Sequence, residues 1–264
     1  MLDLIEKLPP GARVLDLGAG PGSFPITRND LSVVRLDLEI PPARNGGCYV
    51  SADAARMPFA SAAFDLVVSN HSLEHFVELE PTLREIGRVV RPGGTLYIAV
   101  PNTDTLSDRI YRWLARGGGH VNPFRKPEEV VRLVDGLTGL RHGGTRVLYS
   151  SLSFLNAHNF KTRPPRKILL FANGNERFLA VFVWFLRLMD RHLGTRLSQY
   201  GWSFYFGAEP APHARQNWIN VCVRCGSGHS EDFLKKKGSV PPLQGWFKWY
   251  RCPRCKCWNV LTYE

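Results

Sequence analysis

The 264-residue sequence lacks any run of about 18 or more apolar residues, so it predicts no helix that crosses a membrane. A charged segment followed by an apolar one is also missing at its start, so we expect no signal peptide. Acidic residues are few, 23 against 34 basic ones, which leaves a formal net charge of +11. A hydrophobic fraction of 44% indicates a globular rather than a disordered protein. These features predict a cytoplasmic protein that can also contact a membrane surface peripherally.

Residues 14–24, Val-Leu-Asp-Leu-Gly-Ala-Gly-Pro-Gly-Ser-Phe, combine an apolar strand with a glycine-rich turn. Gly18, Gly20 and Gly22 let the backbone turn sharply and approach a ligand closely. We expect the turn to open toward a helix, whose free N–H groups suit an anionic part of a ligand. Asp37 ends a second apolar run, where a carboxylate binds ribose hydroxyls in nucleotide-binding α/β folds. The stretch therefore predicts a nucleotide-like ligand.

Two residues of this stretch separate the possible ligands. A dinucleotide motif requires a third glycine where this chain has Ser23. Asp16, at the end of the first strand, is predicted to face the ligand crevice, where its carboxylate suits a positive group such as the ammonium of an amino acid. Together they favour S-adenosylmethionine over a pyrophosphate cofactor.

The following stretches continue an α/β pattern. Residues 64–70 are typical of a buried parallel strand, and residues 95–100 of the next one. Between them we expect a helix over 79–90 that stops at a turn, Arg91-Pro-Gly-Gly94. Two further strands are predicted at 144–149 and 202–206.

With these segments the chain resembles the class I S-adenosylmethionine-dependent methyltransferases of the small-molecule type. The resemblance covers residues 1–150 by motif and extends to about residue 210 by topology. It implies an α/β fold: a doubly wound, Rossmann-like sheet of seven mostly parallel strands with a helical insertion before the last strand. It does not specify the substrate. The matching segments are 14–24, Asp37, 52–54, 64–76 and 85–96.

The resemblance also implies where the cofactor binds. The glycine turn would lie under its methionyl part, with Asp16 oriented toward the amino group. Asp37 would hold the ribose, and Asp53 would accept from the adenine amine; the alternative for Asp53 is a turn or helix cap. The implied cofactor-binding residues are Asp16, Gly18, Ala19, Gly20, Asp37, Leu38, Asp53, Ala54 and Asn70.

The catalytic candidates are His71, His75 and His120, with Glu74 beside the first two. A sulfonium methyl is strongly electrophilic, so the enzyme mainly aligns the nucleophile, and a hydroxyl nucleophile also needs a base. A packed structural role is the alternative for His75, and a mobile surface position is the alternative for His120, which follows Gly117–Gly119. Some quinone-precursor O-methyltransferases hold a divalent metal here through two glutamates and a histidine. His71 replaces the first glutamate, which weighs against that metal.

Four cysteines predict a second ion site. Cys222, Cys225, Cys252 and Cys255 form two CxxC pairs, the pattern of a tetrahedral structural zinc in a ribbon. Cys257 is an alternative to Cys255. The ribbon is too small to form a core, so we expect the metal to supply its folding energy.

The chain is therefore expected to contain two domains, a methyltransferase domain over 1–212 and a zinc-ribbon-like module over 213–264. The module is basic and aromatic, especially at Gly245–Arg251, which suits stacking on single-stranded nucleic acid or a small core of its own. The insertion, about 151–200, has an apolar centre at 178–186 and a basic stretch at 161–167. Residues 161–191 could anchor peripherally in an anionic membrane surface, or the helix could cover the active site.

Three functions follow from these patterns. The first is methylation of a hydroxyl on a small-molecule, glycan or lipid-linked acceptor. The second is RNA methylation with the ribbon as the docking module, although Asn70-His-Ser-Leu lacks the Asn/Asp-Pro-Pro-aromatic signature of base-amine methylation. The third is a non-catalytic scaffold, against which the set of Asp16, Asp37 and Asp53 argues.

Overall fold

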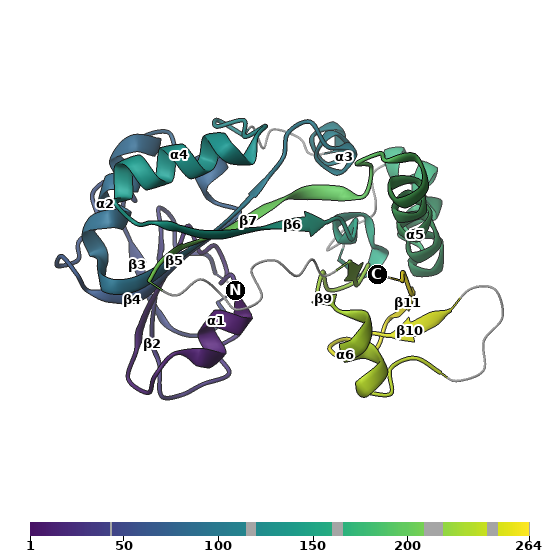
Figure 1. The fold of residues 1–264 in the computed structure, drawn as a ribbon, viewed down its shortest axis with the longest axis horizontal. Coiled ribbons are helices and arrows are strands. Elements are labelled where there is room, and N and C mark those ends of the chain that lie inside the picture. Colours follow the sequence, from purple (N-terminus) through teal and green to yellow (C-terminus); the bar gives the residue numbers. More distant parts are fainter. Residues whose placement is uncertain (43, 115–119, 160–165, 209–218, 242–247, 264) are drawn as a thin grey trace. The chain divides into compact units, whose positions relative to one another are not determined.

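The computed structural model describes residues 1–42, 44–114, 120–159, 166–208, 219–241 and 248–263 (Figure 1). Four of the predicted features lie outside these ranges: the glycine run 117–119, the basic residues 161–165, the aromatic residues 245–247 and the domain boundary at 212–213. Contacts within the chain define two compact units. Unit 1 comprises Met1–Thr103, Gly119–Arg146 and Trp202–Gln216; unit 2 comprises Asp104–Gly118, Val147–Gly201 and Asn217–Glu264.

The largest element is a seven-stranded sheet with the strand order β3-β2-β1-β4-β5-β7-β6. β1 pairs in parallel with β2 and β4, β2 pairs with β3, and β4 pairs with β5. The expected seven-stranded, mostly parallel sheet is thus confirmed. The strands are β1 (Arg13–Leu17), β2 (Ser32–Asp37), β3 (Cys48–Ser51), β4 (Phe64–Asn70), β5 (Val90–Pro101), β6 (His142–Tyr149) and β7 (Gln199–Gly207).

The core of unit 1 lies against the central strands. Their buried side chains are mostly apolar on both faces, as expected for strands inside a parallel sheet, with Asp16, Arg35 and Ser69 as buried polar residues. The helices of unit 1 include α1 (Leu2–Lys7), α2 (Leu79–Val89) and α4 (Pro127–Thr138). α2 and α4 approach closely at Gly87, where a Cβ would lie 2.7 Å from the Thr138 carbonyl oxygen. The fully buried core residues include Val14, Leu15, Leu17, Phe64, Leu66, Val67, Leu83, Ile86 and Ile98.

The helix expected after the glycine turn does not form: residues 18–31 contain turns and bends but no helix. Pro21 and Pro25 have no N–H to donate, and Gly22 has a left-handed φ of +116°, so the segment cannot wind regularly. The connections from β2 to β3 and from β3 to β4 also lack a helix among their described residues. The connections between β1, β2, β3 and β4, where a doubly wound fold has helices, are therefore loops among the described residues.

A second local prediction was wrong at Arg91–Gly94. These residues lie inside β5, which begins at Val90, rather than in a free turn. Gly93, with φ +77°, accompanies a register shift between β4 and β5, from Phe64 opposite Val90 to Leu66 opposite Thr95. The glycine pair thus forms an irregularity within the strand.

Unit 2 joins the predicted insertion to the cysteine module in one core. Leu179, Val183 and Leu186 of α5 (Glu176–Leu193) belong to the same buried cluster as Cys222 and Tyr250. The compact units are therefore divided differently from the domains 1–212 and 213–264, which assigned the insertion to the methyltransferase domain. The other elements of unit 2 are α3 (Leu106–Leu114), η2 (Ser153–Leu155), η3 (Ala157–Asn159), η4 (Arg166–Gly174), β8 (Asn220–Val221), β9 (Gly228–His229), α6 (Glu231–Lys236), β10 (Trp249–Arg251) and β11 (Trp258–Val260). The 3₁₀ segment η1 (Leu73–His75) lies in unit 1.

Within the described residues, no single helix has both the length and the apolar composition to cross a membrane. The segments Lys167–Gly174 and Glu176–Leu193 satisfy that test only when taken together, and they are bent by 101° at their junction.

Candidate functional site

The glycine turn brings backbone close to the carboxyl end of β4. Gly18 has φ +64°, and a Cβ there would lie 2.4 Å from Cβ of Ser72. The N–H groups of Gly18 and Ala19 both donate to the carbonyl of Leu36, at 2.8 and 3.1 Å. Only glycine allows this backbone direction and this close approach, so the turn is fixed over the end of β2.

Asp37, the last residue of β2, anchors the turn from the other side. Its Oδ2 accepts a hydrogen bond from the Gly20 N–H at 2.7 Å. Oδ1 makes no hydrogen bond or ion pair with a described residue, and Asp37 lines the cavity described below, so this oxygen is available to a ligand hydroxyl.

Asp16 does not line the crevice as expected. Its side chain is fully buried, and Oδ2 accepts from the Ser23 N–H at 2.9 Å and from Arg35 at 2.5 Å. Burial raises the pKa of Asp16, against the lowering effect of Ser23 and Arg35. Oδ1 is buried and has no hydrogen-bond partner among the described residues, which makes it the atom of Asp16 that could accept from a ligand.

Arg35 of β2 holds the loops that replace the missing helix. Its side chain is fully buried, and Nε donates to the Gly46 carbonyl at 2.8 Å. Nη2 donates to the carbonyls of Phe24 and Asn45, at 2.7 and 3.2 Å. With Asp16 on Nη1, all three nitrogens of the guanidinium have partners. Sequence reasoning missed this residue, because a single arginine in an apolar strand carries no recognisable pattern.

Asp53 follows β3 and closes a tight turn. Its Oδ1 accepts from the Ala55 N–H at 2.9 Å, and its Oδ2 pairs with Arg56 at 2.6 Å. These are the contacts of the turn-cap alternative, and both oxygens keep further lone pairs. Asp53 and Ala54 also line the cavity described next, so the predicted adenine contacts stay a prediction.

These loops surround a cavity of about 540 Å³ at the carboxyl ends of β1, β2 and β4, all within unit 1. Ligands of open α/β sheets bind at this edge, where the strand order reverses. Asp16, Ala19, Gly20, Asn70 and His120 are not among the lining residues. The lining residues are Gly18, Leu36, Asp37, Leu38, Ala52, Asp53, Ala54, His71, Ser72, His75, Phe76, Val77, Glu78 and Thr82.

His71 is held at the cavity wall by an unusual backbone. It has φ +57°, in the left-handed region that is uncommon for histidine, and its N–H donates to the Ala99 carbonyl at 2.9 Å. Strain of this kind concentrates at functional sites. Burial, reinforced by nearby His120 and His75, lowers the pKa of His71 to about 4, so the imidazole is neutral at physiological pH.

Three further groups meet beside His71. One ligand atom each of Glu74, His75 and His120 lies within 4.8 Å of the others, and the rings of His75 and His120 meet edge to face at 5.2 Å. Glu74 Oε1 lies 3.9 Å from Nδ1 of His71. Such a set can share a proton or hold a divalent ion. The structure thus brings all three predicted catalytic histidines to one place.

Asn122 explains how His120 reaches this group. Its side-chain amide donates to the carbonyls of Leu73 and Phe76, at 3.0 and 2.7 Å. The N–H groups of Val121 and Asn122 both donate to the Glu74 carbonyl. Residues 121–122 are thereby fastened to η1, which contradicts the alternative of a mobile surface position for His120. Sequence reasoning missed Asn122, because no motif connects it with η1.

Comparison with known proteins agrees with this placement of the cavity. Residues 15–98 match a family described as "Methyltransferase domain". A malonyl-[acyl-carrier protein] O-methyltransferase of Methylococcus capsulatus is 31% identical over 187 residues, covering 61% of this chain and 68% of the relative. The chain belongs to the methyltransferase family.

Other relatives of this methyltransferase are similarly distant. A ubiquinone biosynthesis O-methyltransferase of Rhizobium rhizogenes is 31% identical over 167 residues, covering 54% of this chain and 65% of the relative. The chain spans less than two thirds of the length of several curated relatives that it matches. Among solved structures, that of a "putative sarcosine dimethylglycine methyltransferase" from Galdieria sulphuraria has a TM-score of 0.51 at 19% identity over 78% of this chain and 82% of that one. At this identity it supports the fold alone.

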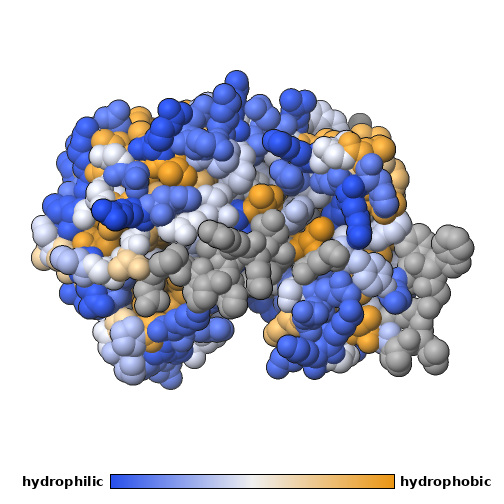
Figure 2. Space-filling view, viewed as in Figure 1, coloured by the Kyte–Doolittle hydropathy of each residue, from blue (hydrophilic) through white to orange (hydrophobic). Residues whose placement is uncertain are grey.

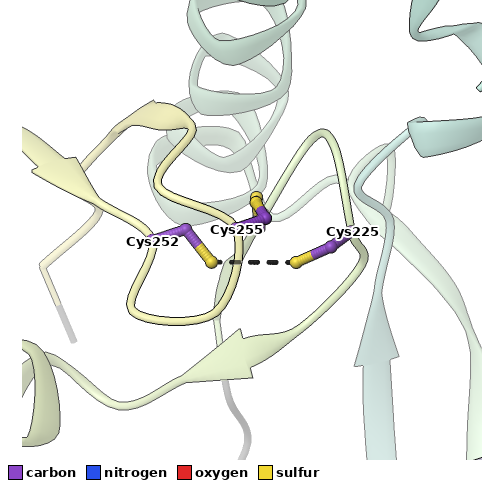
Figure 3. A group of neighbouring side chains, drawn as sticks. Cys225, Cys252 and Cys255 are labelled. Carbon is purple, nitrogen blue, oxygen red and sulfur yellow. Dashed lines mark hydrogen bonds between the residues drawn. The ribbon is translucent and has the colours of Figure 1, made fainter. Parts of the chain in front are cut away.

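The cysteine cluster of this methyltransferase lies in unit 2. Two loops face each other in Figure 3, one carrying Cys225 and the other carrying Cys252 and Cys255. The sulfurs of Cys225 and Cys252 are 3.7 Å apart, and those of Cys222 and Cys255 are 3.5 Å apart. Tetrahedral zinc at about 2.3 Å from each thiolate separates the sulfurs by about 3.8 Å. No disulfide joins the six cysteines, so this donor set fits such an ion.

Donor groups around the cluster point toward one of its sulfurs, as they would toward a thiolate. The backbone N–H of Arg224 and the side-chain amide of Asn259 point to the sulfur of Cys222, at 3.5 and 3.4 Å. Cys257 does not replace Cys255 among the four clustered cysteines, and its sulfur contacts Glu176 of α5 at 3.4 Å. Glu176 also pairs with Arg224 in the first CxxC loop. The cysteine module is thus fastened to α5 by side-chain contacts, so a metal would not be the only source of its folding energy.

Proposed function

We propose that the chain transfers a methyl group from S-adenosylmethionine to a hydroxyl of a small-molecule, glycan or lipid-linked acceptor. The observation that carries this proposal is the cavity at the ends of β1, β2 and β4, where a glycine turn and two aspartates face a group of histidines. Two relatives whose names specify O-methylation, the ubiquinone biosynthesis O-methyltransferase and the malonyl-[acyl-carrier protein] O-methyltransferase, support an oxygen acceptor.

The residues of the cavity fit the cofactor. Gly18 lines the cavity and leaves its backbone open to the methionyl part. Asp16 is buried behind the cavity lining, and its unpartnered Oδ1 would reach the ammonium only after a local shift of the turn. Asp37 would hold the ribose hydroxyls, with Leu38 and Ala54 against the adenine. When bound, S-adenosylmethionine supplies an electrophilic methyl group that needs no further activation.

The histidines act on the acceptor. His75 is exposed and lines the cavity, so its imidazole can take the proton of an acceptor hydroxyl. Glu74 and His120 lie close enough to orient that imidazole and to receive part of its charge. His71 stays neutral and hence presents a hydrogen-bonding wall rather than a cation to the incoming sulfonium.

A radiolabel experiment tests the activity and its acceptor class. The protein is incubated with methyl-tritiated S-adenosylmethionine and, separately, a small-molecule extract, a lipid extract and purified RNA. We expect label in one of the first two fractions, and loss of transfer but retention of cofactor binding in His75→Gln. His142→Gln, at an exposed position of unit 1, is the matched control. Label in RNA would favour RNA methylation, and cofactor binding without any transfer would favour a scaffold.

For the cysteine cluster we infer a structural zinc ion, held by Cys222, Cys225, Cys252 and Cys255. All four positions of a tetrahedral ion are filled by thiolates, so no position remains for substrate. The ion would hold the two CxxC loops together and leave the methyl-transfer chemistry to unit 1. Metal analysis of the purified protein should find one zinc per chain.

A further inference from the structure

Unit 2 contains a buried arginine that forms no ion pair with any described residue. Arg187 of α5 is only 3% exposed. Its Nη2 makes two long contacts, to the carbonyls of Ser150 at 3.4 Å and Val221 at 3.5 Å, and Nε has no hydrogen-bond partner. A buried charge without a partner is destabilising by several kcal/mol (roughly 3–5) when a natural partner has been removed. Such a group therefore points to a missing partner.

The acid nearest in sequence, Asp190, acts to raise the pKa of Arg187, but it makes no hydrogen bond or ion pair with it. Its Oδ1 accepts from the Thr195 hydroxyl and the Leu197 N–H, and its Oδ2 accepts from the N–H and hydroxyl of Ser198. The carboxylate thus fixes the turn after α5. Burial lowers the pKa of Arg187 to about 10, so the guanidinium still carries its charge at physiological pH.

Arg187 lines a pocket of about 120 Å³ that other cations share. Arg191 and Lys248 stand on its wall together with His192, and no described lining residue is acidic. Thr262 adds a buried hydroxyl that has no hydrogen-bond partner in the described chain. The pocket lies between α5 and the residues around β11, all within unit 2. Its full lining is Trp184, Arg187, Leu188, Arg191, His192, Lys248, Leu261, Thr262 and Tyr263.

The donors suit an anion with several oxygens. Among the lining residues, Arg187 has a buried Nε and Thr262 a buried hydroxyl, and neither atom has a hydrogen-bond partner in the described chain. Arg191, whose Nη1 donates to the Tyr263 carbonyl, and Lys248, whose Nζ lies 5.2 Å from the Tyr263 ring centroid, add charge at the exposed side. Three positive side chains match the charge of a phosphate better than that of a single carboxylate.

We propose that this pocket binds a phosphate group. The group can come from free phosphate or from the headgroup of an anionic lipid. The lipid source fits a second feature of unit 2, since α5 exposes Phe178, Val181 and Phe185, and η4 exposes Leu169 and Leu170. In Figure 2, which has the same view as Figure 1, hydrophobic surface lies where Figure 1 places α5. Apolar side chains beside cations are typical of surfaces that dip into an anionic membrane.

Calorimetric titration of the full chain with inorganic phosphate, at constant ionic strength set with chloride, tests the site. We expect one phosphate per chain, and at least a tenfold weaker affinity in Lys248→Gln and in Arg191→Gln, since each loses a charged contact. Both residues are exposed, so these variants should fold. Arg177→Gln, an exposed arginine on the same helix outside the pocket, is the matched control and should bind like the parent. Equal affinity in all three variants, or no binding to the folded parent, would overturn the proposal.

Vesicles then separate the two sources. Flotation with phosphatidylglycerol vesicles, against phosphatidylcholine vesicles, is measured with and without competing inorganic phosphate. Binding to the anionic vesicles that phosphate displaces and that Lys248→Gln weakens identifies the lipid headgroup. Binding of phosphate without flotation identifies free phosphate. Flotation that neither phosphate nor Lys248→Gln changes, together with no phosphate binding in calorimetry, would contradict the pocket as the site.

Discussion

Arg35 in unit 1 and Arg187 in unit 2 are both buried arginines, and their surroundings differ. Arg35 in unit 1 has Asp16 and three backbone carbonyls as partners, so its charge and its donors are satisfied within the chain. Arg187 in unit 2 has two long carbonyl contacts and a pocket of further cations. Burial is therefore common to both residues and does not distinguish them. The partners do: Arg35 organises the loops around the cofactor cavity, whereas Arg187 lacks the anion that its pocket suits.

The units also differ in what holds them together. In unit 1 the buried side chains come mainly from adjacent strands of one parallel sheet. In unit 2, short segments from α5 and the cysteine module share a core that contains two of the four clustered cysteines, Cys222 and Cys252. We therefore expect unit 1 to tolerate metal removal and unit 2 to depend on it.

The largest effect should come from the cysteine cluster. Cys222→Ser should lose bound zinc and open the core of unit 2, because structural zinc contributes about 10–16 kcal/mol of apparent binding energy in small zinc modules. Limited proteolysis should then cut unit 2, while the segments of unit 1 stay protected. Cys48→Ser, which removes an exposed thiol outside the cluster, is the control. Retention of an intact unit 2 after chelation would contradict the zinc site.

The next largest effect should follow Arg35→Met. The change leaves Asp16 buried without its partner, and breaking a buried ion pair from one side costs about 3–5 kcal/mol. Denaturant unfolding measures this loss. Arg44→Met, at an exposed arginine of the neighbouring loop, should change stability by no more than about 0.5 kcal/mol. If the two variants were equally stable, Arg35 would not be the organiser of these loops.

His71 should make the free energy of unfolding depend on pH, by an amount similar to or smaller than the loss expected for Arg35→Met. Its pKa is about 4 in the folded chain, against 6.5 for an ordinary histidine, so between these values the unfolded chain binds more protons. The free energy of unfolding should therefore fall as pH decreases from about 6.5 to 4, by at most about 3 kcal/mol. His71→Asn keeps a residue that tolerates the left-handed backbone and should remove this contribution. An NMR titration midpoint of His71 near 6.5 would contradict the prediction.

The smallest effect is expected for Arg187→Met, and it tests most directly whether Arg187 differs from Arg35. Arg187 has only two long carbonyl contacts and no ion pair with a described residue, so removing its charge should leave stability unchanged or raise it by about 1 kcal/mol or more. In the same denaturant experiment, the change in the free energy of unfolding should thus be close to zero or opposite in sign to that of Arg35→Met. A loss as large as that of Arg35→Met would show that Arg187 is a structural residue with partners of its own.

Sequence patterns predicted the parts of the fold that depend on local periodicity. The strands β1, β2 and β4, α2, and the edge of the sheet that carries Asp37 and His71 follow from apolar runs and glycines. The helix that the sequence patterns predicted after Gly18 is absent from the structure, although Pro21 and Pro25 already disfavoured it. Arg35, Asn122 and the shared core of unit 2 depend on contacts between segments far apart in sequence, which no single pattern records.

The most direct test of the cofactor site is a calorimetric titration of the folded protein with S-adenosylmethionine. Gly18→Ala and Gly11→Ala both place a side chain on a left-handed backbone, but only at Gly18 would the added Cβ meet a neighbour, Ser72, at 2.4 Å beside the cavity. The parent and Gly11→Ala should bind one cofactor per chain, whereas Gly18→Ala, and Asp37→Asn as a variant without that clash, should bind much more weakly. No binding to the folded parent, or equal binding in all variants, would contradict the cavity as the cofactor site.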